Sequence, residues 1–270
     1  MGNIYFELTR EFNSKGPAAL LTSGQAVVHY RIAMMSKDGD WILRETPEAC
    51  RHVLEALARH GARYRPCAPL DVRWLAGGWS SHFEFSDDAG RRVRCDFLSR
   101  PPRLTRSTLH RIFESAPRGE QLLVVDVESL ILMKQTQRAK DYPVVGELAR
   151  LLPPQKEIEY TTDPDTILEL AAGFGKASAR PSVKAALEGL GRDAVVVALA
   201  REIDRLQAED RARLQKYELS SEAYLRSFQS EGVARLKLPE AHARAVRLAE
   251  ELLPVAPPEV RLEERRGGDT

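Results

Sequence analysis

The chain changes its pattern at two consecutive prolines, Pro153 and Pro154. Upstream, short apolar runs typical of strands alternate with helical patterns, whereas almost every later segment has the spacing of a helix. Because proline lacks an amide hydrogen and breaks helices, this pair predicts a boundary between two folding units. We expect an α/β (α+β) domain at residues 1–152, with a small mixed sheet flanked by helices. A C-terminal helical bundle at 153–253 and a flexible tail at 254–270 should follow.

Local signals place the elements within these parts. Thr46 suits the N-terminal cap of a helix, Pro47 its first turn and Gly61 its end. Alternating apolar and polar residues predict a hairpin of Ser81–Phe85 with Arg92–Ser99. Further predicted elements are a helix at Tyr5–Gly16, strands at Pro17–Gly24, Ala33–Glu45 and Val72–Gly77, and later helices at Ala194–Tyr217, Ser221–Val233 and Pro239–Leu253.

Composition excludes several classes of protein. Hydrophobic residues make up 43% of the 270, enough for a core, so a disordered chain is excluded. Lys+Arg 40 against Asp+Glu 39 leaves a net charge of +1, unlike a globally basic nucleic-acid coat. The apolar run at Ala194–Ala200 is far shorter than a membrane span, and three isolated cysteines suit a reducing compartment. We therefore expect a cytoplasmic protein that does not associate with a membrane.

Asp38 and Asp40 are the first candidates for chemistry. Residues two apart in a strand point to the same side, so both carboxylates would project together. A divalent cation is the usual means of offsetting their repulsion, and Mg²⁺ prefers such oxygen ligands. The alternative is a simple turn at Asp38-Gly39, since Asp-Gly is a strong turn signal.

Asp96 strengthens the metal interpretation. It lies in the second hairpin strand, where Arg94 and Asp96 share one face while Val93, Cys95 and Phe97 face the core. On its own such a residue is usually a solvated edge aspartate. Brought beside Asp38 and Asp40, it would complete a two-metal site for phosphoryl or nucleotidyl transfer.

Two further segments could contact phosphates. Ser23-Gly24 ends a predicted strand and opens a helix, where glycine lets backbone amides approach an anion. Lys134 and Arg138 lie at helical spacing farther along the chain, although a solvated basic face would have the same pattern. A stretch dense in arginine could face nucleic acid or a triphosphate, or could be a solvated hairpin: Arg91, Arg92, Arg94, Arg100, Arg103, Arg106 and Arg111.

Taken in order, these pieces resemble the DNA polymerase β-like nucleotidyltransferase superfamily, in particular its minimal bacterial branch, which includes toxins of abortive-infection toxin–antitoxin systems. The resemblance covers about Leu20 to Leu152. The matching motifs are Ser23-Gly24, Ser36-Lys37-Asp38-Gly39-Asp40, Cys95-Asp96-Phe97, Leu130-Ile131-Leu132-Met133-Lys134 and Arg138-Ala139-Lys140-Asp141. Three residues depart from the family pattern, namely Ser23, Gly39 and Trp41. None of these departures removes a carboxylate.

The resemblance implies a Mg²⁺-dependent transfer of a nucleoside monophosphate from an NTP to an acceptor hydroxyl. It implies that Asp38, Asp40 and Asp96 bind two metal ions and carry the catalysis. Contacts to the nucleotide would come from Ser23, Gly24, Ser36, Lys134 and Arg138. The acceptor would be an RNA such as tRNA, a protein or a small molecule, and a cognate antitoxin would be a further partner. The helical part would select the acceptor. The alternative is a binding module that keeps the fold without turnover.

Overall fold

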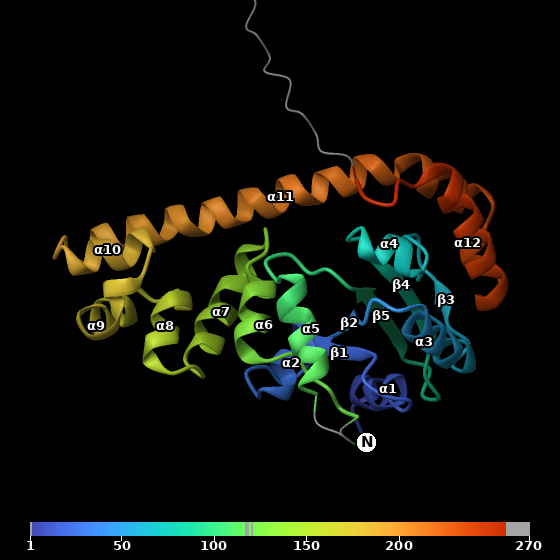
Figure 1. Cartoon of the computed structure of the whole chain (residues 1–270), viewed down its shortest axis with the longest axis horizontal. Coiled ribbons are helices and arrows are strands. Elements are labelled where there is room, and N and C mark those ends of the chain that lie inside the picture. Colours follow the sequence, from blue (N-terminus) through green and yellow to red (C-terminus); the bar gives the residue numbers. More distant parts are fainter. Residues whose placement is uncertain (1, 117–118, 120, 258–270) are drawn as a thin grey trace, which may run out of the picture.

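The computed structural model describes residues 2–116, 119 and 121–257. Its centre is a five-stranded sheet in the order β1-β2-β5-β4-β3, in which only β2 and β5 run parallel (Figure 1). The strands are β1 Ala19–Thr22, β2 Gly39–Leu43, β3 Arg63–Tyr64, β4 Ser81–Ser86 and β5 Arg92–Leu98. Helices pack around this sheet and continue beyond it, so the mixed α/β class with a helical C-terminal part is confirmed.

The predicted hairpin is β4–β5. Val93, Cys95 and Phe97 are buried, while Arg94 and Asp96 are half-buried on the opposite face. This alternation places one apolar and one charged surface on the same pair of strands.

The apolar face of the sheet forms the largest core. Trp41 and Phe97 stack at 5.3 Å between ring centroids, and Phe12 packs edge-on against both. This face is covered by α1 Ile4–Phe12, α3 Pro47–Arg59, α4 Val72–Ala76 and α12 Leu238–Leu252. The same core includes Tyr224 and Phe228, so residues after Pro154 help to bury the sheet.

A second layer covers only the β1–β2 side of the other face. Leu20 and Ile42 are buried there against α2 Ser23–His29, α5 Arg106–Glu114, α6 Val127–Lys134 and α7 Tyr142–Ala149. On this face His82, Glu84, Arg94 and Asp96 of β4 and β5 are half-buried, and they lie outside this second core. The edge of the second layer therefore borders the charged part of the sheet.

The remaining helices form a third, smaller core built on Ile158, Ile167, Val183 and Val195. Its helices are α8 Pro154–Tyr160, α9 Pro164–Phe174, α10 Pro181–Leu187 and the first part of α11 Arg192–Ser230. Short 3-10 turns occur at Ala139–Asp141, Gly175–Ala177 and Val233–Arg235. In Figure 1, α11 runs along the whole molecule, from α9 and α10 to α12. None of the helices in the described ranges combines the length and hydrophobicity needed to cross a membrane.

Three sequence predictions about elements are wrong. Val72–Gly77 is not a strand: α4 occupies Val72–Ala76, and the Asp71 carboxylate caps it by accepting the amide of Arg73 at 2.9 Å. The strand expected at Ala33–Glu45 is limited to Gly39–Leu43. The two helices expected at Ala194–Tyr217 and Ser221–Val233 are one helix of 39 residues.

The division at Pro153 and Pro154 stays a prediction. Of the expected tail, residues 254–257 are described and residues 258–270 lie outside the described part of the chain. The indole of Trp79 donates to the carbonyl of Pro254 at 2.9 Å, so the start of this segment contacts the sheet domain.

Candidate functional site

The candidate carboxylates meet at the edge of the second layer. Asp40 lies on β2 and is paired in register with Asp96 on β5, so the two side chains share one face of the sheet. Asp38 immediately precedes β2. Gly39, between the two aspartates, lies under aromatic rings: an added Cβ would come within 2.4 Å of Trp41 and 2.5 Å of Tyr5. The glycine at position 39 therefore has a packing cause.

Asp40 has a strongly perturbed carboxyl group. Burial raises the pKa of its carboxyl to about 6, and repulsion from Asp96 and Asp38 adds to the shift. A hydrogen bond from Ser23 and the charge of Lys134 oppose it. Asp40 thus interacts with four of the predicted site residues.

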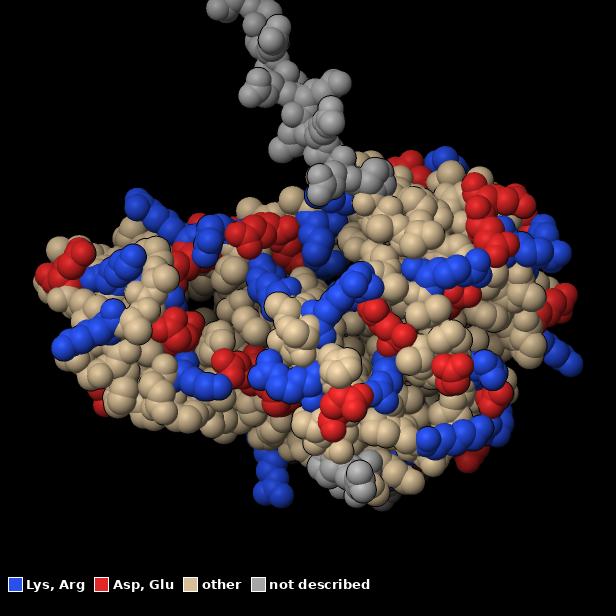
Figure 2. Space-filling model, in the orientation of Figure 1, with Lys and Arg blue, Asp and Glu red and all other residues tan. Residues whose placement is uncertain are grey.

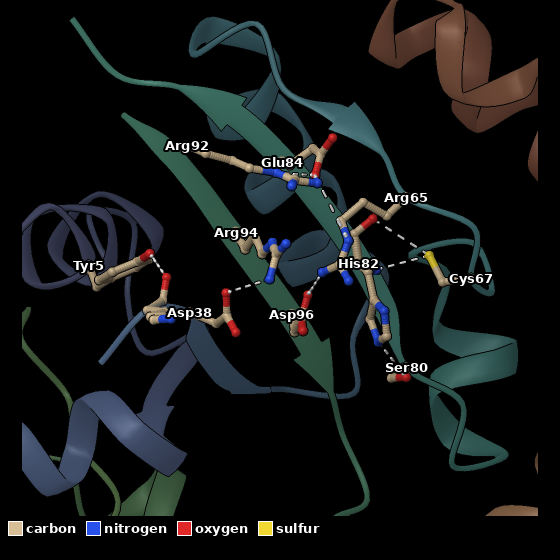
Figure 3. Close-up of polar contacts among 11 residues, drawn as sticks. Tyr5, Asp38, Arg65, Cys67, Ser80, His82, Glu84, Arg92, Arg94 and Asp96 are labelled. Atoms are coloured by element: carbon tan, nitrogen blue, oxygen red, sulfur yellow. Dashed lines mark hydrogen bonds and ion pairs between the residues drawn. The ribbon is translucent and has the colours of Figure 1, made fainter. Parts of the chain in front are cut away.

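Asp96 and Asp38 each have an arginine partner (Figure 3). Arg65 lies 3.2 Å from the Oδ1 atom of Asp96, and Arg94 lies 3.4 Å from the Oδ1 atom of Asp38. Burial raises the pKa of Asp96 to about 6; Arg65 and Arg94 oppose the shift and Asp38 adds to it. Tyr5 holds the backbone beside Asp38, since its hydroxyl donates to the carbonyl of Lys37 at 2.6 Å.

The Ser23-Gly24 segment packs directly against the loop that carries Ser36. Ser23 has a φ of 53°, a conformation unfavourable for residues other than glycine, and its hydroxyl bonds to Asp40. A Cβ on Gly24 would come within 2.2 Å of the Ser36 hydroxyl. Gln25 fixes the same loop by donating to the carbonyl of Ser36 at 2.9 Å. Glycine is required at position 24 for this close approach.

Lys134 ends α6 and is buried. The helix begins after Asp126, whose side chain caps it by accepting the amide of Ser129 at 2.9 Å. Burial lowers the pKa of Lys134, while Asp141, at 3.6 Å from its ammonium, raises it. Arg138 donates to the other oxygen of Asp141 at 2.8 Å. The two predicted cations therefore share one buried carboxylate in this structure.

The donor chemistry fits magnesium, because the three carboxylates supply the hard oxygen ligands that this ion prefers. Across residues 2–116, 119 and 121–257, however, no three His, Cys, Asp or Glu side chains are arranged so that they could hold a metal ion. Asp38 and Asp96 instead face Arg94 and Arg65. Binding of a metal ion would thus require these side chains to reorient.

A cavity of about 670 Å³ adjoins the end of α6. Leu132, Gln135 and Tyr142 form one wall, and Arg201 and Leu206 of α11 contribute to the other. Figure 2 shows charges of both signs interspersed over the visible face, which is hollowed below α11. The helical part of the chain thus forms one wall of this cavity. The other wall includes Gln135, which directly follows Lys134.

Comparisons with known proteins find structural neighbours of low sequence identity. No protein-family model matches it, and neither does any curated protein. A solved structure from H. pylori described as a "putative nucleotidyltransferase" is 12% identical, with a TM-score of 0.38 over 77% of this chain and 96% of its own. JHP933 from Helicobacter pylori is 11% identical, with a TM-score of 0.36 over 80% and 95%. At these TM-scores, neither neighbour assigns a function to this chain.

The sequence interpretation missed Arg65. It placed Arg94 on the same strand face as Asp96 but gave it a role only as part of a basic stretch. Arg65 follows a two-residue strand that leaves almost no periodic signal. Arg94 alternates with Asp96 on β5, and that spacing was the available clue. Most other arginines of the basic stretch have partners inside the protein: Arg91 with Asp87, Arg92 with Glu84, Arg100 with Glu45, and Arg103 with Glu209.

Proposed function

We propose that this chain is a Mg²⁺-dependent nucleotidyltransferase that moves a nucleoside monophosphate from an NTP to an acceptor hydroxyl. The observation that carries the proposal is the register pair of Asp40 and Asp96 on neighbouring parallel strands, with Asp38 beside them. Their mutual repulsion in a half-buried site makes a divalent cation favourable there. Asp38, Asp40 and Asp96 would hold the metal ions, which supply charge neutralisation at the triphosphate.

The other predicted residues have roles consistent with their positions. Ser23 and Gly24, with Ser36 packed against them, lie on the β1–β2 side of Asp40 and would contact the triphosphate. Lys134 approaches the same side and would offset its charge, with Arg138 next to it. Here the protein acts by positioning and electrostatic stabilisation rather than by covalent chemistry.

Transfer would proceed as an in-line displacement. The acceptor oxygen forms a bond to the α-phosphorus, the bond from that phosphorus to the bridging oxygen breaks, and pyrophosphate leaves. Asp96 would complete the metal site and accept the hydroxyl proton. The helical part lines the cavity opposite α6 and α7, next to Lys134, and its selection of the acceptor is inferred from the sequence alone. A toxin role, a cognate antitoxin and a cytoplasmic location rest on the sequence alone.

Labelling tests the proposal. Wild-type protein is incubated with each α-labelled NTP, Mg²⁺, and either total RNA or cell lysate, and the labelled product is separated and identified. We expect label in one acceptor class, and none when Mg²⁺ is omitted or Asp40 is replaced by Asn. Independently, Mg²⁺ should raise the melting temperature of wild type but not of Asp40→Asn. Transfer by Asp40→Asn at the wild-type rate would exclude the assigned site.

One observation favours a second candidate, a nucleotide-binding module without turnover. Asp38 and Asp96 already have arginine partners, which satisfy charge that a metal ion would otherwise offset. Such a module would bind NTP with or without Mg²⁺ and label no acceptor. Titration with a non-hydrolysable NTP analogue in Mg²⁺ and in chelator separates the two candidates.

A further inference from the structure

Arg94 has fewer of its hydrogen-bond donors satisfied than Arg91 of the same hairpin. Its Nη1 atom lies 3.4 Å from Asp38, at the outer limit of a hydrogen bond, and its buried Nε atom has no hydrogen-bond partner among the described residues. In contrast, Arg91 donates through Nε to Asp87 at 2.8 Å. A buried donor without a partner is costly and calls for an explanation, such as a ligand group.

Arg65 is the second cation on this surface. One of its terminal nitrogens lies 3.2 Å from Asp96, and its Nε atom is 4.0 Å from Glu84. About a third of each of the Arg65 and Arg94 side chains is exposed. Figure 3 shows both guanidiniums on the same face of β4 and β5, directed toward the carboxylates. They form a pair of partly satisfied donors at the open side of the site.

The pair lies on the opposite side of the carboxylates from Ser23 and Lys134. In sheet order, Ser23 follows β1 and bonds to Asp40 on β2, whereas Arg94 is on β5 and Arg65 follows β3. In an in-line displacement the leaving pyrophosphate and the attacking hydroxyl lie on opposite sides of the phosphorus. If the triphosphate binds beside Ser23 and Lys134, the acceptor enters on the side of the arginines.

We propose that Arg65 and Arg94 bind a phosphate group of the acceptor, which makes a nucleic-acid strand the substrate class of this site. This inference rests on the proposed function for the direction of the acceptor. Planar guanidiniums donate in pairs to phosphate oxygens, whereas a neutral small molecule would leave them unsatisfied. A phosphate beside Asp38 and Asp96 would also be repelled without these two cations.

Binding experiments with two phosphate sources test the assignment. The first probe is a short fluorescent single-stranded RNA with a free 3′ hydroxyl, followed by anisotropy over a series of salt concentrations. The second is a non-hydrolysable NTP analogue, and both are measured with Mg²⁺. The variants are Arg94→Gln and Arg65→Gln. The matched control is Arg91→Gln, which removes the same charge from an exposed arginine at the hairpin turn.

We expect Arg94→Gln and Arg65→Gln to weaken RNA binding about tenfold each and to reduce the salt slope by about 1, while Arg91→Gln changes neither. Affinity for the NTP analogue should stay within about twofold of wild type. Arg94→Lys, which keeps the charge but loses the planar fork, should recover part of the RNA affinity, and melting curves confirm that each variant folds.

Two results would overturn the inference. RNA binding by Arg94→Gln that equals that of Arg91→Gln removes the phosphate site. Loss of NTP affinity with unchanged RNA affinity assigns the arginines to the nucleotide instead. Failure of the proposed function is distinct: if wild type binds no NTP in Mg²⁺ but its RNA affinity still depends on Arg94, the phosphate site is supported and the transferase is not.

Discussion

The carboxyl group of Asp40 lies among charges of both signs, and the negative ones dominate. Its pKa is raised to about 6 by burial and by Asp96, so the folded protein binds this proton more tightly than the unfolded chain does. The contribution of Asp40 to stability is therefore largest below the ordinary pKa of an aspartate, and it is lost as the pH rises through about 6. Without a metal ion, the charged form of Asp40 destabilises the fold at neutral pH.

Asp40→Asn should remove this cost. We expect the metal-free variant to be more stable than wild type near pH 7.5, by up to about 3 kcal/mol, and to converge with it near pH 4. Urea unfolding at a series of pH values in chelator measures the difference. Asp88→Asn, at an exposed turn, is the control and should follow the wild-type curve. An Asp40→Asn protein that is less stable than wild type at pH 7.5 would contradict the electrostatic account.

Lys134 differs from Asp40 in that its buried charge has an ion-pair partner of opposite sign, Asp141. Lys134→Met keeps an apolar stem and should weaken binding of an NTP analogue by about 1.5–3 kcal/mol, the usual value of a hydrogen bond to a charged group. The free energy of unfolding should fall by less, because Arg138 still pairs with Asp141. Isothermal titration and urea unfolding separate the two effects. Lys140→Met, at an exposed position six residues later, is the control and should change neither nucleotide affinity nor stability. If Lys134→Met binds the nucleotide as tightly as wild type, Lys134 has only a structural role.

At the scale of elements, the contact of α2 with the loop before β2 depends on a missing side chain. Gly24→Ala would place a methyl group 2.2 Å from the Ser36 hydroxyl, so α2 or the loop must move. We expect a loss of about 1–3 kcal/mol in stability and weaker NTP binding. Gly173→Ala is the control: nothing lies within 4 Å of its added Cβ, and within α9 alanine should stabilise by up to about 1 kcal/mol. The melting temperatures of both variants measure these effects. A Gly24→Ala protein as stable as wild type would contradict the packing argument.

The sequence predicted the elements whose apolar residues recur at regular spacing or whose ends carry capping residues. It failed for α11, which packs against two different cores along its length. Alternation along β5 identified the face of Asp96, and the caps of α3 were visible as Thr46 and Pro47. The helix α11 was divided because it buries Val195 and Leu199 at one end and Tyr224 and Phe228 at the other. Between Tyr217 and Ser221, the polar residues Glu218 and Ser220 interrupt the apolar spacing, which resembles the end of a helix. The pairing of Arg65 with Asp96 was unpredictable because it depends on the sheet order.

At the scale of the whole molecule, the sheet and the last two long helices share a core. Tyr64 packs against Phe228 and its hydroxyl bonds to His242 at 2.8 Å, while the indole of Trp74 donates to the carbonyl of Leu253 at 3.2 Å. These contacts join β3 and α4 to α11 and α12. The end of the helical part therefore stabilises the sheet that carries the candidate site, in addition to any role in selecting an acceptor.

This shared core predicts joint unfolding of the sheet and the C-terminal helices. Phe228→Ala, at a fully buried position, should lower the free energy of unfolding by about 3–5 kcal/mol. All three tryptophans, Trp41, Trp74 and Trp79, lie in the first part of the chain, so their fluorescence reports on the sheet side, whereas circular dichroism at 222 nm reports mainly on the helices. In Phe228→Ala both signals should shift to lower urea together, since one core serves both. Leu219→Ala, at an exposed position on the same helix, should shift neither. A Phe228→Ala protein in which the circular dichroism changes while the tryptophan transition stays at its wild-type midpoint would mean that the sheet folds without the C-terminal helices.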